Sequence, residues 1–430
     1  MDRPNIILII TDQQRQDMMS CAGNKYVNTP NIDHIAKNGL RFQNAYCSNP
    51  VCSPSRFSIL TGKMPSEVNL KSDYDKNIRI TADILDNGIA KRLKEIGYEV
   101  VYAGKEGLRG IKVSDLGFDV ISTEGRDQTV DVCCEYIHNS QEEHPFFMVT
   151  SFLNPHDICY MAIYDFIDEM GEEKKAFLPR GKEFDRIEQI KLHKDQVGEE
   201  IFYADICPHL PDNYLPQQDE PEIIEELLKS RNFRYMARTT YTDNEWRMHR
   251  YIYAKVTESV DSQIGIVMKA LKEKGIEDNT IILFTSDHGD MDASHKMEHK
   301  SVLYEEVMKI PFIISDPNAK RVGVCSDLVS NGLDIYPTIC DYAGLDVPLN
   351  LKGKSLKPLL NGECIEKRKF LKVESEIGDA VVTTDHKYVM YHHGANKEQL
   401  YDLNKEPLEM CNNANDLNYQ SILEEMRKLL

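Results

Sequence analysis

The sequence predicts an α/β fold that ends in a small C-terminal α+β subdomain. Short apolar runs alternate along the chain with longer helical patterns, as they do in α/β proteins. Polar residues gather just past the carboxyl ends of the predicted strands, where open α/β sheets bind their ligands. After residue 365 the apolar runs become closely spaced, strand-like pieces that are followed by one more helical pattern.

Each strand predicted in the larger part of the chain is followed by residues that can carry chemistry. The first of them, at residues 5–10, is continuously apolar from residue 6 onward, which is typical of a strand buried on both faces. The predicted strands with the polar residues that follow them are 5–10 before Asp12-Gln13, 99–103 before Lys105, 146–152 before His156, and 281–285 before Asp287-His288. Two further strands are predicted at 380–383 and 387–391. We expect the four polar sites to converge at one place on the sheet.

Four helices are predicted from periodicity and capping residues, at 81–96, 246–274, 334–343 and 419–430. Thr81 is a suitable N-cap and Gly97 a suitable C-cap for the first helix, although Asn87-Gly88 weakens its continuity. Gly275 ends the second helix.

These elements divide the chain into a large domain at residues 1–365 and a C-terminal subdomain at 366–430. Residues of about 160–245 are charged, irregular and too numerous for a connector. We expect this insertion to cover the mouth of the ligand site, with a solvated decoration as the alternative.

Composition excludes several functional classes. The chain has 430 residues, with 51 Lys and Arg against 70 Asp and Glu and a net charge of -19, which argues against non-specific nucleic-acid binding. No apolar run approaches the length of a bilayer span, and we expect no signal peptide because the apolar run near the N-terminus is too short. The eleven cysteines lack the spacing of a disulfide or zinc framework. Buried free thiols and a cytoplasmic location are therefore expected.

The most specific signal is the stretch that starts at Cys52. It reads Cys-Ser-Pro-Ser-Arg, followed after three further residues by Leu-Thr-Gly. This spacing resembles, position for position, the nucleophile motif of type I sulfatases, the formylglycine-dependent branch of the alkaline phosphatase superfamily. In that family the cysteine is oxidised after translation to formylglycine, whose hydrated aldehyde attacks sulfur. The resemblance implies that Cys52 is the precursor of the nucleophile, with a buried cysteine in a turn as the alternative.

The resemblance extends over most of the chain. It includes the segments at residues 29–33, 39–42 and 399–403. The family fold, shared with alkaline phosphatase, is a large mixed β-sheet sandwiched by helices, with a small antiparallel sheet. That fold is what the resemblance implies here.

A metal site is predicted where two strands end. Asp12, Gln13 and Asp287-His288 offer carboxylate, amide and imidazole groups, and hard divalent cations prefer oxygen-rich sites. The sequence Ser-Asp-His-Gly-Asp around Asp287 also resembles a sulfatase segment. By that resemblance Asp12, Gln13, Asp287 and His288 hold the ion, and the modified Cys52 completes its shell. Calcium is the first expectation, with magnesium or manganese as alternatives because a histidine ligand leaves the metal identity open.

Three cations are predicted to bind the scissile group, namely Arg56, Lys105 and Lys300. A sulfate monoester carries one negative charge, and more develops on the leaving oxygen as its bond to sulfur breaks. Fixed cations that meet this charge lower the barrier. The resemblance implies that Arg56 supports the formylglycine hydrate and that Lys300 contacts the sulfate and the leaving oxygen.

Proton transfer is assigned first to His156 and second to His295. The family commonly has Gly-Lys-x-His where this chain reads Gly-Lys-Glu-Gly at residues 104–107, so the family histidine is absent at Gly107. The Asn-Pro-His sequence that ends at His156 resembles the substrate-contacting histidine of the family. A histidine with a near-neutral pKa transfers protons at working pH, although either residue can instead be a hydrogen-bonded loop histidine.

The resemblance implies a sulfuric ester hydrolase that cleaves a sulfate monoester of a small anionic substrate. We expect a carbohydrate, because the predicted insertion is polar and charged. A formylglycine-generating, or sulfatase-maturating, enzyme is the implied partner. The nearest alternative is a phosphonate monoester or phosphodiester hydrolase on the same scaffold, which Gln13 and the absent histidine favour. The alternative outside enzymes is a binding protein in which Cys52 remains a thiol.

Overall fold

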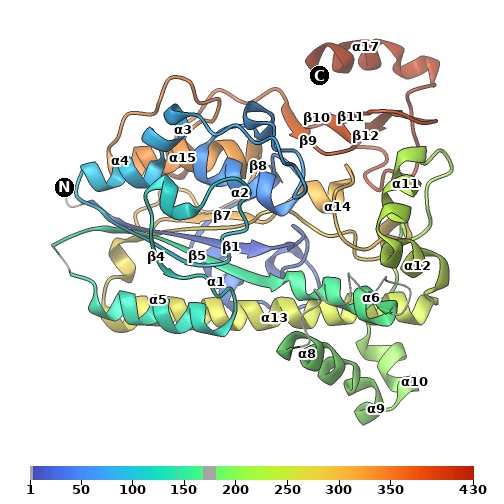
Figure 1. Ribbon diagram of the computed structural model, residues 1–430, viewed down its shortest axis with the longest axis horizontal. Coiled ribbons are helices and arrows are strands. Elements are labelled where there is room, and N and C mark those ends of the chain that lie inside the picture. The colour runs from blue at the N-terminus through green and yellow to red at the C-terminus, as the bar shows by residue number, and fades with distance from the viewer. Residues whose placement is uncertain (1–2, 142, 168–180) are drawn as a thin grey trace.

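The computed structural model describes residues 3–141, 143–167 and 181–430. Within these residues, eight strands form one sheet in the order β4-β3-β5-β1-β6-β7-β2-β8, with helices on both faces (Figure 1). Strand β7 runs antiparallel to its neighbours β6 and β2, whereas the other pairs are parallel. The mixed sheet sandwiched by helices is therefore confirmed.

The strands of the large sheet are β1 (Asn5–Asp12), β2 (Gly39–Tyr46), β3 (Glu99–Gly104), β4 (Asp119–Ser122), β5 (Phe146–Pro155), β6 (Thr280–Ser286), β7 (Phe312–Ser315) and β8 (Gly323–Ser330). A smaller sheet contains β9 (Leu371–Glu374), β10 (Gly378–Val382), β11 (His386–Tyr391) and β12 (Glu398–Asp402). The helices are α1 (Pro30–Lys37), α2 (Cys52–Thr61), α3 (Ala82–Asp86), α4 (Ile89–Glu95), α5 (Asp127–Asn139), α6 (Cys159–Asp165), α8 (Lys182–Lys191), α9 (His193–Val197), α10 (Glu199–Ile201), α11 (Glu222–Ser230), α12 (Asn232–Thr240), α13 (Asp243–Lys274), α14 (Glu305–Met308), α15 (Asn331–Ala343), α16 (Lys357–Leu360) and α17 (Gln420–Leu429).

The central strand β1 shows how the sheet is held between its helices. The side chains of Ile6, Leu8 and Ile10 pack in the core cluster that includes residues of α2, α4 and α15. Those of Ile7 and Ile9 pack in the cluster that includes residues of α1, α5 and α13. The continuous apolar run therefore reflects a strand whose two faces are both buried, as parallel strands in α/β proteins are.

Helix α13 confirms the long helix predicted to end at Gly275. Its N-terminus is a capping box, in which the backbone N–H of Glu245 donates to Thr242 Oγ1 at 3.3 Å and the N–H of Thr242 donates to Glu245 Oε2 at 2.6 Å. Gly275 adopts the left-handed conformation of a C-cap. The helix begins before the predicted residue 246 because this capping box precedes the first large apolar side chain.

The single helix predicted at residues 81–96 is wrong, since the chain forms α3 and α4 with a break at Asn87-Gly88. Gly88 is extended, with φ -58° and ψ 139°, and caps the start of α4. A Cβ at this position would lie 2.9 Å from the carbonyl oxygen of Leu116. Glycine is therefore required at position 88 because the backbone of Leu116 approaches it closely. This contact explains why the helical pattern of the sequence is interrupted at Asn87-Gly88.

The predicted C-terminal sheet is confirmed. Among the described residues, four strands form an antiparallel sheet in the order β12-β11-β10-β9 beside the large sheet (Figure 1). Leu423 and Met426 of α17 pack on Val381, Tyr388 and Leu400 on one face of this sheet. The opposite face shares a core cluster with α11 and α14, which ties the C-terminal part of the chain to the rest.

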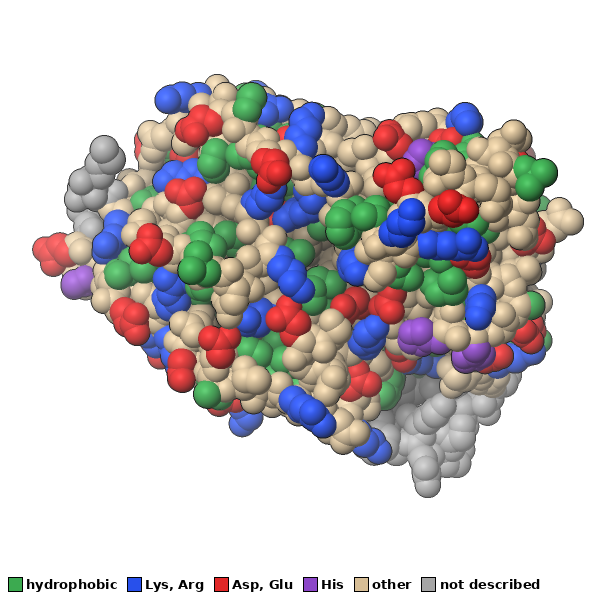
Figure 2. Space-filling model, turned by 90° about the horizontal axis from the view of Figure 1, so that it is seen from above, with side chains coloured by type: hydrophobic (Ala, Val, Ile, Leu, Met, Phe, Trp, Pro, Cys, Tyr) green, Lys and Arg blue, Asp and Glu red, His purple; other side chains and the backbone are tan. Residues whose placement is uncertain are grey.

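The cysteine side chains are mostly buried, as expected. All eleven cysteines lie within the described ranges and are free, and seven are buried, so buried free thiols do predominate. Among the described residues, no helix combines the length and the apolar character that a membrane span requires. Figure 2 shows Lys and Arg side chains interspersed with Asp and Glu on one face, and several of the basic groups border a hollow near its middle.

Gly104, the last residue of β3, offers a test of the packing that precedes Lys105. Its φ is +103°, and a Cβ would clash with the carbonyl oxygen of Ser151. We expect Gly104→Ala to lower the free energy of unfolding by about 2–4 kcal/mol, from backbone strain and overpacking together. Gly97→Ala is the matched control, because Gly97 has φ +91° and nothing within 4 Å of the added Cβ. It should cost about 1–2 kcal/mol in denaturant unfolding, and equal losses would contradict the packing argument.

Candidate active site

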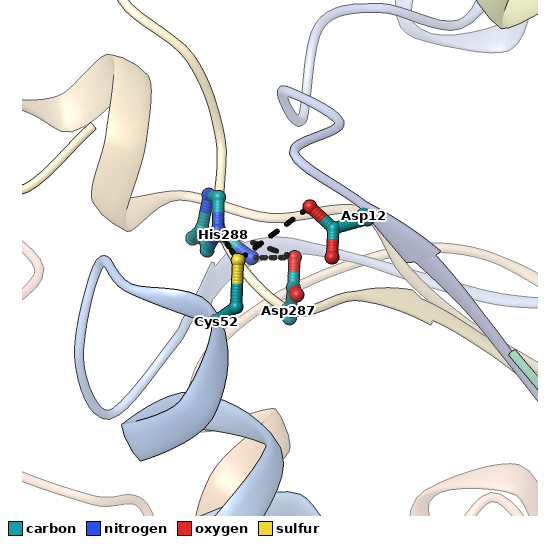
Figure 3. A group of neighbouring side chains, drawn as sticks. All are labelled: Asp12, Cys52, Asp287 and His288. Carbon is teal, nitrogen blue, oxygen red and sulfur yellow. Dashed lines mark hydrogen bonds and ion pairs between the residues drawn. The ribbon is translucent and has the colours of Figure 1, made fainter. Parts of the chain in front are cut away.

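Asp12 and Asp287 lie side by side because β1 and β6 are parallel neighbours. Thr11 pairs with Ser286 in the register of these strands, and the N–H of Asp287 donates to the carbonyl oxygen of Thr11 at 3.1 Å. Cys52 joins them from the first turn of α2, and Figure 3 shows its sulfur facing Asp12 and the ring of His288. The strand ends thus converge as expected.

The buried guanidinium of Arg56 connects the two carboxylates. Its Nε donates to Asp287 Oδ2 at 2.8 Å, and its Nη2 donates to Asp12 Oδ2 at 3.0 Å. Its Nη1 donates to Ser151 Oγ at 2.6 Å and to the carbonyl oxygen of Lys105 at 3.0 Å. Although burial opposes the charge, the two carboxylates raise the pKa of Arg56 above its usual value. Such complete pairing is what makes a buried guanidinium tolerable.

Four potential ligand atoms lie beside this cluster. One atom each from Asp12, Cys52, Asp287 and His288 lies within 4.8 Å of all the others. His288 Nδ1 lies 2.8 Å from the carbonyl oxygen of Gly289, so Nδ1 carries the proton and Nε2 keeps its lone pair. Burial lowers the pKa of His288 to about 4, which keeps the ring neutral. Two carboxylates and a neutral imidazole fit a divalent cation such as Ca²⁺, Mg²⁺ or Mn²⁺.

Gln13, also predicted as a ligand, orients its neighbours. Its backbone N–H donates to Asp287 Oδ1 at 3.0 Å. Its side-chain Nε2 donates to Asp290 Oδ2 at 2.6 Å, and its Oε1 accepts from the thiol of Cys159 at 3.2 Å. Both ends of the Gln13 side-chain amide thus already have hydrogen-bond partners. Metal ligation by Gln13 stays a prediction.

Two lysines flank the sulfur of Cys52. Lys300 Nζ lies 2.8 Å from Sγ and Lys105 Nζ lies 3.6 Å from it, while Lys105 also pairs with Asp12. Burial, together with the Asp12 carboxylate, raises the pKa of the Cys52 thiol to about 12. An unmodified cysteine here is therefore a neutral thiol at pH 7. The two lysines place positive charge beside this residue, which suits the binding of an anionic reacting group, whereas the charge of Arg56 is already paired with Asp12 and Asp287.

A cavity of about 520 Å³ opens beside Cys52 and the two lysines, and its volume is typical of a small-molecule site. Cys52, Lys105, His156 and Lys300 all line it. His156 Nδ1 is buried without a hydrogen-bond partner among the described residues. Burial and the charge of Lys105 lower the pKa of His156 well below its usual value, so the ring is neutral at pH 7. The structure thus brings the first-choice histidine into the cavity.

His295, the second-choice histidine, does not line this cavity. Its ring stacks on Tyr304 with 4.1 Å between ring centres, and its Nε2 lies 3.4 Å from Asn213 Nδ2. His299 lines the cavity instead, packed against Phe233. Sequence spacing alone does not separate the two histidines, because the backbone between them turns through several positive-φ residues.

Gly107 occupies the position at which the Gly-Lys-x-His motif has its histidine. Its φ is +58°, and a Cβ would lie 2.9 Å from Arg56 Cδ and 3.2 Å from Lys105 Cε. A side chain here would therefore press against the stems of Arg56 and Lys105 as they are placed in this chain. Gly107 thus packs closely against Arg56, and among the described residues His156 and His299 are the histidines that line the cavity.

Both ends of the predicted insertion at 160–245 contribute to the cavity. Tyr160 of α6 lines it from one end, and Arg231, Phe233 and Arg234 line it from the other. The described residues of α8, α9 and α10 do not. Sequence reasoning missed Arg231 and Arg234, since an arginine in a charged segment has no local feature that marks it as pocket-lining.

The chain is similar to known proteins along its whole length. The family model described as Sulfatase matches residues 4–345, and the model described as N-sulphoglucosamine sulphohydrolase, C-terminal, matches residues 293–430. A Bacteroides thetaiotaomicron relative named Delta 4,5-hexuronate-2-O-sulfatase is 31% identical, with 100% of this chain and 88% of the relative covered. The solved structure of a 2-O GAG sulfatase superposes with a TM-score of 0.83 at 28% identity, covering 100% of this chain and 91% of that one. A structure in complex with its substrate D-glucosamine-2-N,6-O-disulfate has a TM-score of 0.73 at 25% identity, covering 100% and 97%.

The four potential ligands Asp12, Cys52, Asp287 and His288 predict that a divalent cation stabilises the folded protein. At a concentration of Ca²⁺, Mg²⁺ or Mn²⁺ one hundred times its Kd, we expect a gain of about 2.7 kcal/mol, seen as a rise of several degrees in Tm. Asp12→Asn should remove this rise, because it removes a ligand charge. Asp334→Asn should retain it, since Asp334 is a buried carboxylate that pairs with Arg368 outside the cluster. A rise that survives Asp12→Asn would place the cation elsewhere.

Proposed function

The chain belongs to the sulfatase family, and we propose that it hydrolyses sulfate esters of a carbohydrate with the side chain at position 52 as the nucleophile. The observation that carries the proposal is the position of Cys52, which lines the cavity between Lys105 and Lys300 and beside Asp12 and His288. The named hexuronate sulfatase and the structure with a sulfated glucosamine support a carbohydrate substrate.

We further propose that Cys52 acts as formylglycine. The hydrated aldehyde supplies one hydroxyl that attacks sulfur as the bond to the alcohol oxygen breaks, and a second through which sulfate is later released. The high pKa of the thiol argues against an unmodified Cys52 as the nucleophile, since it would have little thiolate at pH 7. Every residue of α2 is buried, so the sulfatase-maturating enzyme must reach Cys52 before this helix packs.

A divalent cation, calcium in the first instance, would be held by Asp12, Asp287, His288 and the side chain at position 52. Such an ion lowers the pKa of a hydroxyl that it binds. Arg56 contributes by engaging the Oδ2 atom of each aspartate, while Asp12 Oδ1 lies toward the sulfur of Cys52 at 3.7 Å. The arginine thereby fixes the orientation of both carboxylates.

Lys105, Lys300 and His156 serve the substrate in this scheme. The two ammonium groups bind the sulfate oxygens and stabilise the negative charge that develops as the ester bond breaks. His156 is neutral in the free site, and an anionic sulfate beside it favours its protonated form. The imidazolium can then donate a proton to the leaving alcohol oxygen.

Replacing the nucleophile tests this scheme directly. Cys52→Ala should abolish sulfate release from a substrate that the wild type hydrolyses, because alanine can neither form nor release the sulfate ester. Intact-mass spectrometry of the active wild type should show a chain lighter than the unmodified sequence, as a formyl group replaces the thiol-bearing carbon. Cys340→Ala, a buried cysteine on α15, is the matched control. Unchanged turnover in Cys52→Ala would rule the scheme out.

The choice between sulfate and phosphonate is tested with 4-nitrophenyl sulfate and 4-nitrophenyl phenylphosphonate. A sulfate presents three oxygens to Lys105 and Lys300, whereas a phosphonate has a carbon in place of one of them. We expect kcat/KM to favour the sulfate by about tenfold or more, from the loss of one charge-assisted hydrogen bond. A preference for the phosphonate would instead support the related hydrolase activity.

A further inference from the structure

Arg234 is a buried cation without a counter-charge among the described residues. Its exposed fraction is 2%, yet no carboxylate of the described chain pairs with it. Its Nη1 donates to the carbonyl oxygen of Lys300 at 3.2 Å, and its Nε has no hydrogen-bond partner. Burial and the neighbouring charge of Arg231 lower its pKa to about 10, which still leaves it charged at pH 7.

The other buried arginines of the described chain are paired. Arg56 is bonded to Asp12 and Asp287, and Arg15 is bonded to both carboxylate oxygens of Asp17. An uncompensated buried charge is costly, so a pocket-lining one indicates an anionic ligand.

The neighbours of Arg234 do not supply the missing charge. Arg231 also lines the cavity, where it stacks on Tyr74 at 4.7 Å and pairs with Glu376 at 3.3 Å. Phe233 contributes an aromatic ring, with the guanidinium carbon of Arg234 at 5.9 Å from its centre. This end of α12 is therefore positively charged overall where it meets the cavity.

We propose that Arg234 is the core of a second anion subsite, which binds a carboxylate or a second sulfate on the same sugar that carries the scissile sulfate. The proposal rests on the proposed function and extends it to substrates with two anionic groups. A guanidinium donates two parallel hydrogen bonds to either oxyacid group.

Lys300 sets the distance between the two subsites. Its carbonyl oxygen accepts a hydrogen bond from Arg234, whereas its Nζ contacts Cys52 Sγ. The unpaired guanidinium and the nucleophile are thus separated by no more than one lysine residue and its two contacts. Cys52 and Arg234 also line the same cavity, so one small substrate can contact both.

The test uses three substrates that differ only at carbon 6, namely methyl glucoside 2-sulfate, methyl glucuronide 2-sulfate and methyl glucoside 2,6-disulfate. Calorimetric Kd values on the Cys52→Ala variant and kcat/KM on the active enzyme are measured for each. We expect the carboxylate or the second sulfate to improve binding by about 10- to 100-fold over the neutral parent, as charge-assisted hydrogen bonds do. The group with the larger gain identifies the source of the anion.

Arg234→Met should remove the preference for a second anionic group, because it replaces the buried guanidinium by an apolar side chain of similar length. Arg238→Met is the matched control, because Arg238 lies on the same helix, pairs with Glu220 and does not line the cavity. It should keep the preference. The subsite would be overturned if all three compounds bound equally well while Arg234 is present. It would also be overturned if Arg234→Met weakened the binding of all three compounds equally.

The two proposals fail in different ways. Hydrolysis without any preference for a second anion would retain the sulfatase function and reject the subsite. A binding preference that depends on Arg234 but accompanies no sulfate release would retain the subsite and reject the proposed substrate class.

Discussion

The rest of the site depends on one ion-pair cluster, in which Arg56 bonds to Asp12 and Asp287 at once. These carboxylates come from adjacent strands and would repel each other in a buried environment without the guanidinium. Breaking such a buried pair typically costs about 3–5 kcal/mol. Because Arg56 stands one turn after Cys52 on α2, the same contacts fix the nucleophile relative to the ends of β1 and β6. Gly107 packs closely against the side chain of the same arginine.

The candidate active site is rich in positively charged side chains although the protein as a whole is negatively charged. The chain carries a net charge of -19, yet Lys105, Lys300 and Arg234 line one cavity. A cationic pocket in an acidic protein can bind small anions while the surface as a whole does not attract nucleic acid. Neutral His156 and His299 add no charge to the free site, so its positive charge comes from the lysines and arginines.

The features that the sequence could predict are those encoded locally. The apolar run before Asp12 and the polar residues after it specify a buried strand with a ligand at its end, and the spacing after Cys52 is specific on its own. The other features depend on contacts between distant segments. His299 enters the cavity because of positive-φ turns, and Arg234 is distinctive because no carboxylate of the described residues pairs with it. The break at Gly88 reflects a carbonyl group that lies 2.9 Å from a hypothetical side chain.

The central claim is that strand-end carboxylates, a histidine and the side chain at position 52 share one cation. Crystals grown with Mn²⁺ and measured at its absorption edge test the claim most directly. We expect one strong anomalous peak within ligand distance of Asp12, Asp287, His288 and position 52. The claim would be contradicted if, in a crystal saturated with Mn²⁺, the anomalous peak lay away from these four residues. It would also be contradicted if the four side chains pointed away from one another in that crystal.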